Sequence, residues 1–203
     1  MEDNARFEKQ IEFIREIDKE KMIKRQSYLT DCETHENDAE HAWNMAIMTL
    51  LLKEYANEEI DVLKTISMLL IHDLVEVYAG DTYAYDEEGK KTQAEREAKA
   101  ADKLYGMLPE DQCEYLKSLW IEFEEQKTPE ARFARTMDCF QPLLLNDATD
   151  GRAWKEHDVR RSWVMKRNEN THLGSEEIWE YAREKLIEAN VKKGNIIDDR
   201  SEQ

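Results

Sequence analysis

An adjacent histidine and aspartate interrupt the most apolar stretch of this chain, and that stretch constrains the fold more than any other. Residues 68–77 read Met-Leu-Leu-Ile-His-Asp-Leu-Val-Glu-Val, so His72, Asp73 and Glu76 are polar groups among apolar ones. Burying a polar or charged group without a partner is costly. The fold therefore has to bring these side chains partners from elsewhere in the chain, or a metal ion.

Hydrophobic periodicity along the chain predicts helices, and we find neither a convincing strand run nor a hairpin turn. The helix at 62–77 is apolar nearly all round, so it should be the central one. Asp38 and Thr92 are predicted N-caps of two others. The predicted fold class is all-α, with helices at residues 7–24, 38–56, 62–77, 92–104, 110–126, 159–167 and 175–191, and one that begins at residue 128.

Two segments without a helical pattern are predicted to be loops, at residues 26–37 and 79–91. The second lies beside the end of the central helix and contains Asp81, Tyr83 and Tyr85. Long loops in compact domains are often functional lids. The alternative is a disordered, solvated connection.

The length of the chain favours a single domain. With 203 residues it can bury a substantial core. We expect one domain over residues 1–203, with its core at about 17–170, a C-terminal helix at 175–191 and an acidic tail at 196–203.

The acidic balance of the chain limits its partners. Lys and Arg number 29 against 46 Asp and Glu, which gives a formal net charge of −17. A nucleic-acid polymer needs a basic surface, so we expect no binding to one. A small anionic substrate remains compatible if a local arginine, lysine or metal ion supplies positive charge.

The cysteine pattern and the first residues predict a soluble, cytoplasmic protein. Cys32, Cys113 and Cys139 are far apart and lack CxxC spacing, as expected of reduced thiols. The chain starts with a charged segment that lacks the apolar core of a signal peptide, and no apolar run reaches transmembrane length. We therefore expect no association with a membrane.

Four residues are candidate metal ligands: His41, His72, Asp73 and Asp138. Each lies on or near an apolar helix face. Two imidazoles and two carboxylates suit a divalent ion such as Mn, Fe, Co, Ni or Zn and leave coordination positions open. Neighbouring residues on a helix point about 100° apart, so an ion shared by His72 and Asp73 has to lie over the helix between them.

Glu76 lies four residues after His72, on the same face of the predicted helix. A carboxylate at that position can act as a general acid or base beside the ion. The alternative is that Glu76 only accepts a hydrogen bond that orients His72.

Three motifs in this order resemble the HD superfamily of metal-dependent phosphohydrolases, and more narrowly the branch that contains 5′-deoxynucleotidases. They are Glu40-His41-Ala42-Trp43, the segment HDLVEVYAGD at 72–81 and the segment DCFQPLLLN at 138–146. The resemblance covers roughly residues 17–170. It implies an HD-type helical bundle and hydrolysis of a nucleoside 5′-monophosphate. It also implies one divalent ion, which could be Mn, Co, Fe, Ni, Zn or Mg, on the four candidate ligands.

The resemblance also implies roles for residues outside the ligand set. By position, Arg25 matches the family's phosphate-contacting arginine, Glu76 its catalytic glutamate and Asp81 its substrate-side aspartate. Well-studied bacterial members carry a tryptophan directly after that arginine, whereas this chain has Gln26, so the preference for deoxyribose stays open. A homodimer is also implied.

Two other functions compete with phosphomonoester hydrolysis. A phosphodiesterase or pyrophosphohydrolase site usually adds histidines for a second ion, yet this sequence has no histidine between His72 and His157. A non-catalytic, metal-stapled scaffold or regulatory protein would need neither Glu76 nor Arg25, and it would prefer a closed coordination shell. The sequence therefore favours a single-metal phosphomonoesterase.

Overall fold

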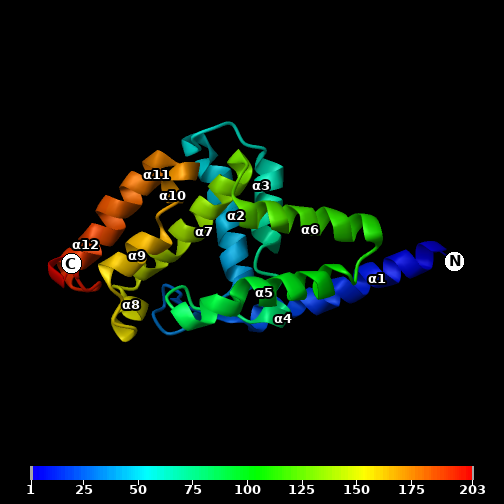
Figure 1. Ribbon diagram of the computed structural model, residues 1–203, viewed down its shortest axis with the longest axis horizontal. Coiled ribbons are helices and arrows are strands. Elements are labelled where there is room, and N and C mark those ends of the chain that lie inside the picture. The colour runs from blue at the N-terminus through cyan, green and yellow to red at the C-terminus, as the bar shows by residue number, and fades with distance from the viewer. Residues whose placement is uncertain (1, 203) are drawn as a thin grey trace.

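Helices packed around α7 make up most of the computed structural model (Figure 1), which describes residues 2–202 and the side chains of residues 4–201. The α-helices are α1 (Glu2–Ile17), α2 (Asp38–Leu52), α3 (Val62–Ile71), α4 (Glu76–Ala79), α5 (Glu87–Tyr105), α6 (Glu110–Glu125), α7 (Pro129–Ala148), α8 (Arg152–Glu156), α9 (Arg161–Arg167), α10 (Thr171–Gly174), α11 (Glu176–Tyr181) and α12 (Glu188–Lys193). The remaining elements are strands β1 (Lys24–Tyr28) and β2 (His35–Asn37), the 3-10 helices η1 (Asp18–Met22), η2 (Lys53–Tyr55) and η4 (Arg200–Glu202), and the π-helical segment η3 (Ala182–Ile187). The predicted all-α class is confirmed.

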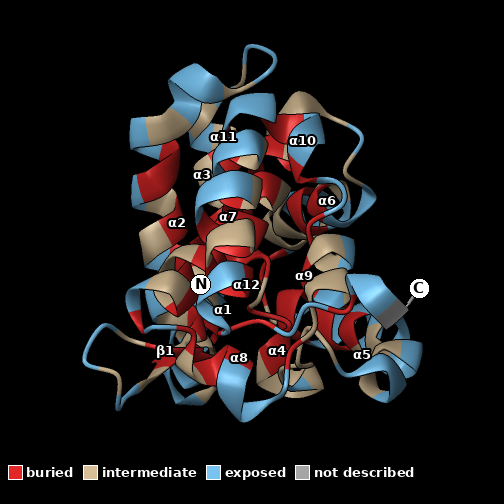
Figure 2. Ribbon diagram, turned by 90° about the vertical axis from the view of Figure 1, so that its left-hand side faces the viewer, coloured by how far each residue is buried: buried red, intermediate tan, exposed pale blue. Residues whose placement is uncertain are grey.

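Helix α7 lies at the centre of the core and contacts α2, α3, α6 and α10. Its apolar residues Phe133 and Met137 are fully buried, and Phe140 is buried as well. Figure 2 shows buried positions along the facing sides of α2, α3 and α7. A helix enclosed in this way holds its side chains rigidly, so a polar residue on α7 is placed accurately.

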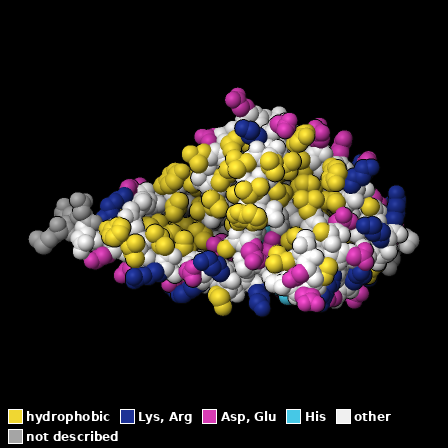
Figure 3. Space-filling view, turned by 180° about the vertical axis from the view of Figure 1, so that it is seen from behind, with side chains coloured by type: hydrophobic (Ala, Val, Ile, Leu, Met, Phe, Trp, Pro, Cys, Tyr) yellow, Lys and Arg dark blue, Asp and Glu magenta, His cyan; other side chains and the backbone are white. Residues whose placement is uncertain are grey.

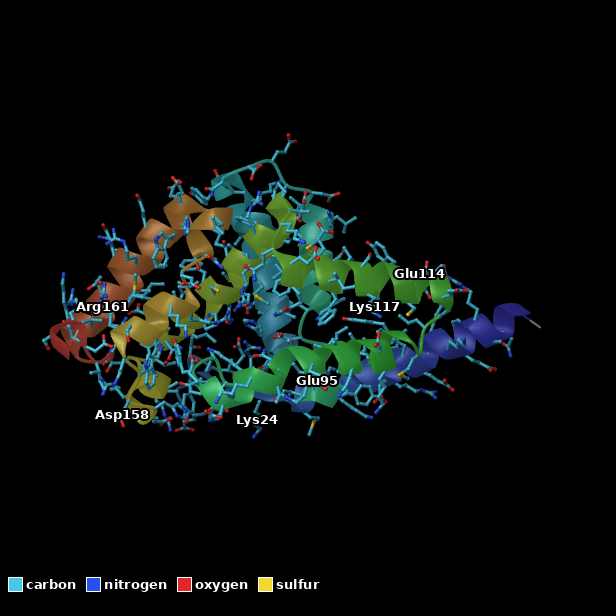
Figure 4. The ribbon with its side chains drawn as sticks, in the orientation of Figure 1. Lys24, Glu95, Glu114, Lys117, Asp158 and Arg161 are labelled. Atoms are coloured by element: carbon cyan, nitrogen blue, oxygen red, sulfur yellow. The ribbon has the colours of Figure 1, made fainter. Side chains whose placement is uncertain are left out.

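Helices α1, α5 and α6 extend together to one side of the molecule, while α11 and α12 lie at the opposite side (Figure 1). Arg6 of α1 binds both carboxylate oxygens of Asp111 in α6, at 2.7 and 2.8 Å. Lys117, on the side of α6 that faces α5 (Figure 4), pairs with Asp102 of α5. Ion pairs on the surface thus join helices that the core holds at one end.

The prediction of a loop at residues 26–37 is wrong in part, because β1 and β2 form an antiparallel hairpin there. Its turn contains no glycine. Instead, one carboxylate oxygen of Asp31 accepts hydrogen bonds from the backbone N–H groups of Glu33 and Thr34, each at 2.9 Å. Cys32 takes a left-handed conformation with φ of 59°. An aspartate that closes a turn in this way leaves no standard hairpin signal in the sequence.

The predicted continuous helix at 62–77 is also wrong, because α3 ends at Ile71 and α4 begins at Glu76. Between them the backbone winds more tightly than an α-helix. Hydrogen bonds that reach three residues back, instead of four, start at the N–H groups of Leu74, Glu76, Val77 and Tyr78. The His-Asp pair therefore lies in a turn, where its side chains are not restricted to helical directions.

Side chains account for this break in the helix. Nδ1 of the His72 ring lies 2.9 Å from the carbonyl oxygen of Leu69. The hydroxyl of Tyr105 donates to the carbonyl oxygen of Ile71 at 3.0 Å. Partners outside the helix thus bind its last carbonyl groups. Hydrophobic periodicity cannot detect such an arrangement.

Two helix starts also differ from prediction. Asp86, and not Thr92, caps α5, since its carboxylate accepts from the N–H groups of Glu88 and Gly89 at 3.1 and 3.0 Å. The loop before α5 is correspondingly shorter than residues 79–91. Helix α2 is capped by Asn37, which forms a capping box with Glu40. Asp38 is left free of capping and points into the core, where it is fully buried.

Within residues 2–202, none of the helices combines the length and the apolar character that crossing a membrane would require.

Candidate active site

All four predicted metal ligands meet at the end of α3. Nε2 of His41, from α2, lies 3.2 Å from Oδ1 of Asp138, from α7. Nε2 of His72 lies 3.0 Å from Oδ2 of Asp73 and 3.8 Å from Oδ1 of Asp138. Ligand atoms of His41, His72 and Asp73 lie within 4.8 Å of one another. Residues up to 97 positions apart in the sequence thus surround one point.

Hydrogen bonds fix how the two imidazole rings point. Nδ1 of His41 lies 2.9 Å from Oε1 of Gln141, and Nδ1 of His72 lies 2.9 Å from the Leu69 carbonyl oxygen. The Gln141 amide donates to Glu36 at 2.5 Å, which leaves its oxygen to face His41. Because both partners are acceptors, each Nδ1 donates a hydrogen, which leaves each Nε2 as the atom that would bind an ion. The two Nε2 atoms therefore point toward the shared centre as ligands would.

The electrostatics of the centre fit a cation. Burial and the Arg25 charge lower the pKa of His41 to about 4, so this ring is neutral at pH 7. Although burial opposes it, the charge of Asp73 helps raise the pKa of His72 to about 10. Nε2 of His72 is buried and faces Asp73 at 3.0 Å without the geometry of a hydrogen bond, and at this pKa it carries a proton that a metal ion would replace. A divalent ion would satisfy this nitrogen and compensate the carboxylates, so the residues present fit one.

Two arginines hold the outer oxygen of Asp138. Arg135 and Arg167 donate to Oδ2 at 2.7 and 2.9 Å, while Oδ1 faces the imidazoles. Burial alone would raise the pKa of Asp138, but these arginines and the two histidines lower it. Asp138 is therefore ionised and presents one oxygen to the candidate metal centre.

The hairpin brings Arg25 to the same place. Its Nη1 donates to Asp38 at 3.0 Å and to Asp73 at 2.7 Å, so it joins β1, α2 and the turn after α3. Burial disfavours its charge, yet Asp73 and Asp38 raise the pKa of Arg25 above its ordinary value. A guanidinium beside the ligand cluster can bind phosphate oxygens through paired hydrogen bonds.

Glu76 is a second unusual acid in the cluster. It is buried, with 7% exposure, and one of its oxygens has no hydrogen-bond partner. Burial, with the neighbouring charges of Asp73 and Asp38, raises the pKa of Glu76 to about 11. This carboxyl group therefore holds its proton more readily than an ordinary glutamate, as a general acid requires. Asp81 lies nearby, and burial raises its pKa as well.

Most of these residues line a cavity of about 730 Å³. The lining residues include Arg25, His72, Asp73, Glu76 and Asp138. The hairpin also contributes Gln26, and the loop before α5 contributes Asp81, Tyr83 and Tyr85. A volume of this size exceeds the needs of a metal ion and one phosphate group, so a larger organic molecule can enter.

Sequence reasoning missed several residues that hold the site together. Asp38 was assigned to capping, and Gln141, Arg135 and Arg167 received no role. A signal was present for three of them. Asp38 lies three residues before His41, while Arg135 and Gln141 lie three residues on either side of Asp138. Residues at that spacing share a helix face, so polar ones beside a buried ligand are candidates for its support. No comparable signal marks Arg167.

The family model for the HD domain matches residues 17–179 of the chain. That range contains every residue predicted for the site. The match confirms the resemblance drawn from the three sequence motifs.

A solved structure has the same fold over nearly the whole chain. The crystal structure of a predicted metal-dependent phosphohydrolase from Magnetospirillum magnetotacticum aligns with 95% of this chain and 96% of its own, with a TM-score of 0.89 and 45% identity. The expected HD-type helical fold is therefore confirmed.

Curated relatives of the chain are named 5′-deoxynucleotidases. HDDC2 of Dictyostelium discoideum is 32% identical over 140 residues, which cover 66% of this chain and 74% of that protein. HDDC2 of Bos taurus is 29% identical over 136 residues, which cover 66% of this chain and 64% of the relative. HDDC2 of Homo sapiens is 27% identical, and 65% of its length is covered. The chain thus spans slightly less than two thirds of the mammalian relatives.

Proposed function

We propose that this chain, which belongs to the HD domain family, is a metal-dependent phosphohydrolase that removes phosphate from nucleoside 5′-monophosphates. One observation carries the proposal: two oriented imidazoles and two carboxylates converge beside Arg25 at a large cavity. The names of the relatives support the nucleotide as substrate. The chemistry of each side chain gives it a place in the reaction.

His41, His72, Asp73 and Asp138 would hold one divalent ion. When bound, such an ion supplies a Lewis acid for the phosphoryl group and for the attacking water. Gln141 and the Leu69 carbonyl keep the imidazole rings oriented toward it, because both accept from Nδ1. Arg135 and Arg167 do the same for the Asp138 carboxylate.

Arg25 would bind the phosphate group. Its guanidinium lines the cavity and lies 2.7 Å from Asp73, so a phosphate at the centre would be within its reach. The side chain is held by Asp38, which limits its freedom before the substrate arrives. Positioning of this kind lowers the entropic cost of reaching the transition state.

Glu76 would supply the proton that the leaving group needs. The nucleoside 5′-oxygen leaves as an alkoxide unless it is protonated, and a neutral buried carboxylic acid is suited to that transfer. Asp81 also lines the cavity and can accept a hydrogen bond from the sugar.

We also propose that the protein is a homodimer. Figure 3 shows hydrophobic side chains gathered across one face of the molecule. Large apolar residues that stay exposed on α2 and α3 include Trp43, Leu50, Leu51, Leu63 and Leu70. An exposed apolar area of this extent favours association. Measurement of the molar mass in solution tests this, and a monomer at all concentrations would contradict it.

The function is tested by measuring phosphate release from a panel of substrates, each with Mn, Co, Mg, Ni or Zn. The panel contains deoxyribonucleoside and ribonucleoside 5′-monophosphates, cyclic phosphodiesters and nucleoside triphosphates. We expect release from the monophosphates. Because Gln26 lines the cavity, the paired ribose and deoxyribose substrates measure the sugar preference. Cleavage confined to diesters or pyrophosphates would favour the alternative hydrolase, and no cleavage would favour a metal-stapled scaffold.

A further inference from the structure

The cavity is lined by aromatic side chains as well as by residues of the metal-ligand cluster. Tyr83 and Tyr85 from the loop before α5 line it together with Trp163 of α9. His157, which follows α8, adds a fourth ring against Tyr83. We call these four residues the aromatic row. None of them has a role in the chemistry described above.

The four rings form a continuous series. The centroids of His157 and Tyr83 lie 4.8 Å apart, and those of Tyr83 and Tyr85 lie 5.3 Å apart in an edge-to-face arrangement of 87°. Tyr85 and Trp163 follow, with centroids 6.1 Å apart. These separations are typical of interacting aromatic pairs. The row is therefore one surface and not a set of isolated rings.

The row is held in place before any ligand binds. Arg96 of α5 donates to the hydroxyl of Thr82 at 2.6 Å and to the carbonyl oxygen of Ala79, which anchors the loop at its start. At the other end of the row, the side-chain oxygen of Gln26 lies 3.1 Å from Nε2 of His157. A surface fixed in this way loses little entropy when a ligand packs on it.

Packing inside the protein does not account for all of the row. Trp163 is 40% exposed although it is a large aromatic residue, and Tyr83 and Tyr85 are only partly buried. Aromatic faces that line a cavity and are left open to it favour a planar, apolar ligand group.

We infer that the aromatic row stacks on the planar base of the nucleotide while its phosphate lies at the ligand cluster. This inference rests on the proposed function, since it assigns the rest of the same substrate. Stacking uses the face of a base and not its hydrogen-bonding edge, so every base can be accepted. The row would therefore distinguish nucleotides from phosphoesters without a base.

The first experiment measures binding of a free nucleoside to the metal-free protein by titration calorimetry. We expect saturable binding that Trp163→Leu weakens by roughly fivefold to a hundredfold, the range that one base–aromatic stack contributes. Trp163→Phe keeps a ring and should retain most of the affinity. Tyr115→Leu, which removes an exposed aromatic side chain of α6 outside the cavity, is the control and should bind like the unchanged protein.

The outcomes separate this inference from the proposed function. Equal binding to the unchanged protein and Trp163→Leu, or no saturable binding to either, would overturn the stacking role. If Trp163→Leu fails to fold, Tyr83→Leu measures the same contact. A second experiment compares phosphate release from a nucleoside 5′-monophosphate and from the matching pentose 5-phosphate. Release from both with equal kcat/KM would overturn the row alone, whereas release from neither would overturn the function.

Discussion

The metal-ligand cluster and the aromatic row are built from different kinds of contact. At the ligand cluster, directional hydrogen bonds and ion pairs place each side chain, as where two arginines fix one oxygen of Asp138. In the aromatic row, rings contact one another at tilted or edge-to-face angles and stay partly open to the cavity. The proposed roles differ in the same way: the metal-ligand cluster requires accurately placed side chains for the reaction, whereas the aromatic row would accept different bases. Substitutions in the metal-ligand cluster should lower kcat, and substitutions in the aromatic row should raise KM.

The strongest test of the metal-ligand cluster is Asp73→Ala. Loss of one ligand should leave the purified protein with less than stoichiometric metal, and phosphate release should fall to background because the Lewis acid is lost. Elemental analysis and a phosphate assay measure both effects. Asp102→Ala, which removes an exposed carboxylate of α5, is the control. Full metal occupancy in Asp73→Ala would remove this residue from the ligand set.

Glu76→Ala should have the next largest effect. We expect kcat to fall by at least about a hundredfold, the usual scale for losing a general acid or base. Metal content should stay stoichiometric, since Glu76 is outside the ligand set. Unchanged turnover would remove Glu76 from the mechanism.

Gln141→Leu tests whether supporting residues matter as much as ligands. Without the acceptor for Nδ1, the His41 ring loses its orientation, and metal affinity should fall by about 10–100-fold. Competition with a chelator measures this affinity. Gln112→Leu alters a surface amide that pairs with Gln10 and serves as the control. Equal metal affinity in Gln141→Leu and the unchanged protein would contradict the orienting role.

Tyr83→Leu tests the aromatic row. We expect KM for a nucleoside 5′-monophosphate to rise by roughly tenfold while kcat stays within about twofold, because ground-state binding alone is lost. Steady-state kinetics separate the two constants. A fall in kcat without a change in KM would show that the aromatic row takes part in the chemistry. The distinction between the metal-ligand cluster and the aromatic row would then be wrong.

Lys117→Ala should have the smallest effect. The ion pair with Asp102 is exposed to solvent and lies outside the cavity, so the free energy of unfolding should drop by less than about 1 kcal/mol. Metal content, kcat and KM should all stay unchanged. Urea denaturation measures the free energy of unfolding. Any change in kcat would mean that the active site is sensitive to distant surface contacts.

The sequence predicts the helical class and the candidate ligands for the same reason. Apolar residues at helical spacing mark the core faces, and His41, His72, Asp73 and Asp138 are polar interruptions of those faces. The resemblance to the HD superfamily adds Arg25 on the basis of position alone. The structure brings these five residues to one place, which neither periodicity nor spacing could establish.

What the sequence does not predict depends on hydrogen bonds between side chains and backbone. The hairpin turn is closed by the Asp31 carboxylate, and α3 ends where the His72 ring meets the Leu69 carbonyl group. Such contacts leave no periodic pattern. Asp38 is predicted to be an N-cap because aspartate favours that position, whereas its neighbour Asn37 has that role. The roles of residues at the site thus depend on neighbours that come from distant segments.

Helix α5 holds two segments of the chain that contribute to the cavity. Arg96 anchors the loop that bears two rings of the aromatic row, and Tyr105 binds the last carbonyl group of α3, next to His72. Nine residues separate them, or about 14 Å along a rigid helix axis. Helix α5 thus fixes the loop that bears Tyr83 and Tyr85 relative to the turn that contains His72. Under the proposed function, this fixed spacing would limit the distance between the base and the reacting phosphate of a substrate.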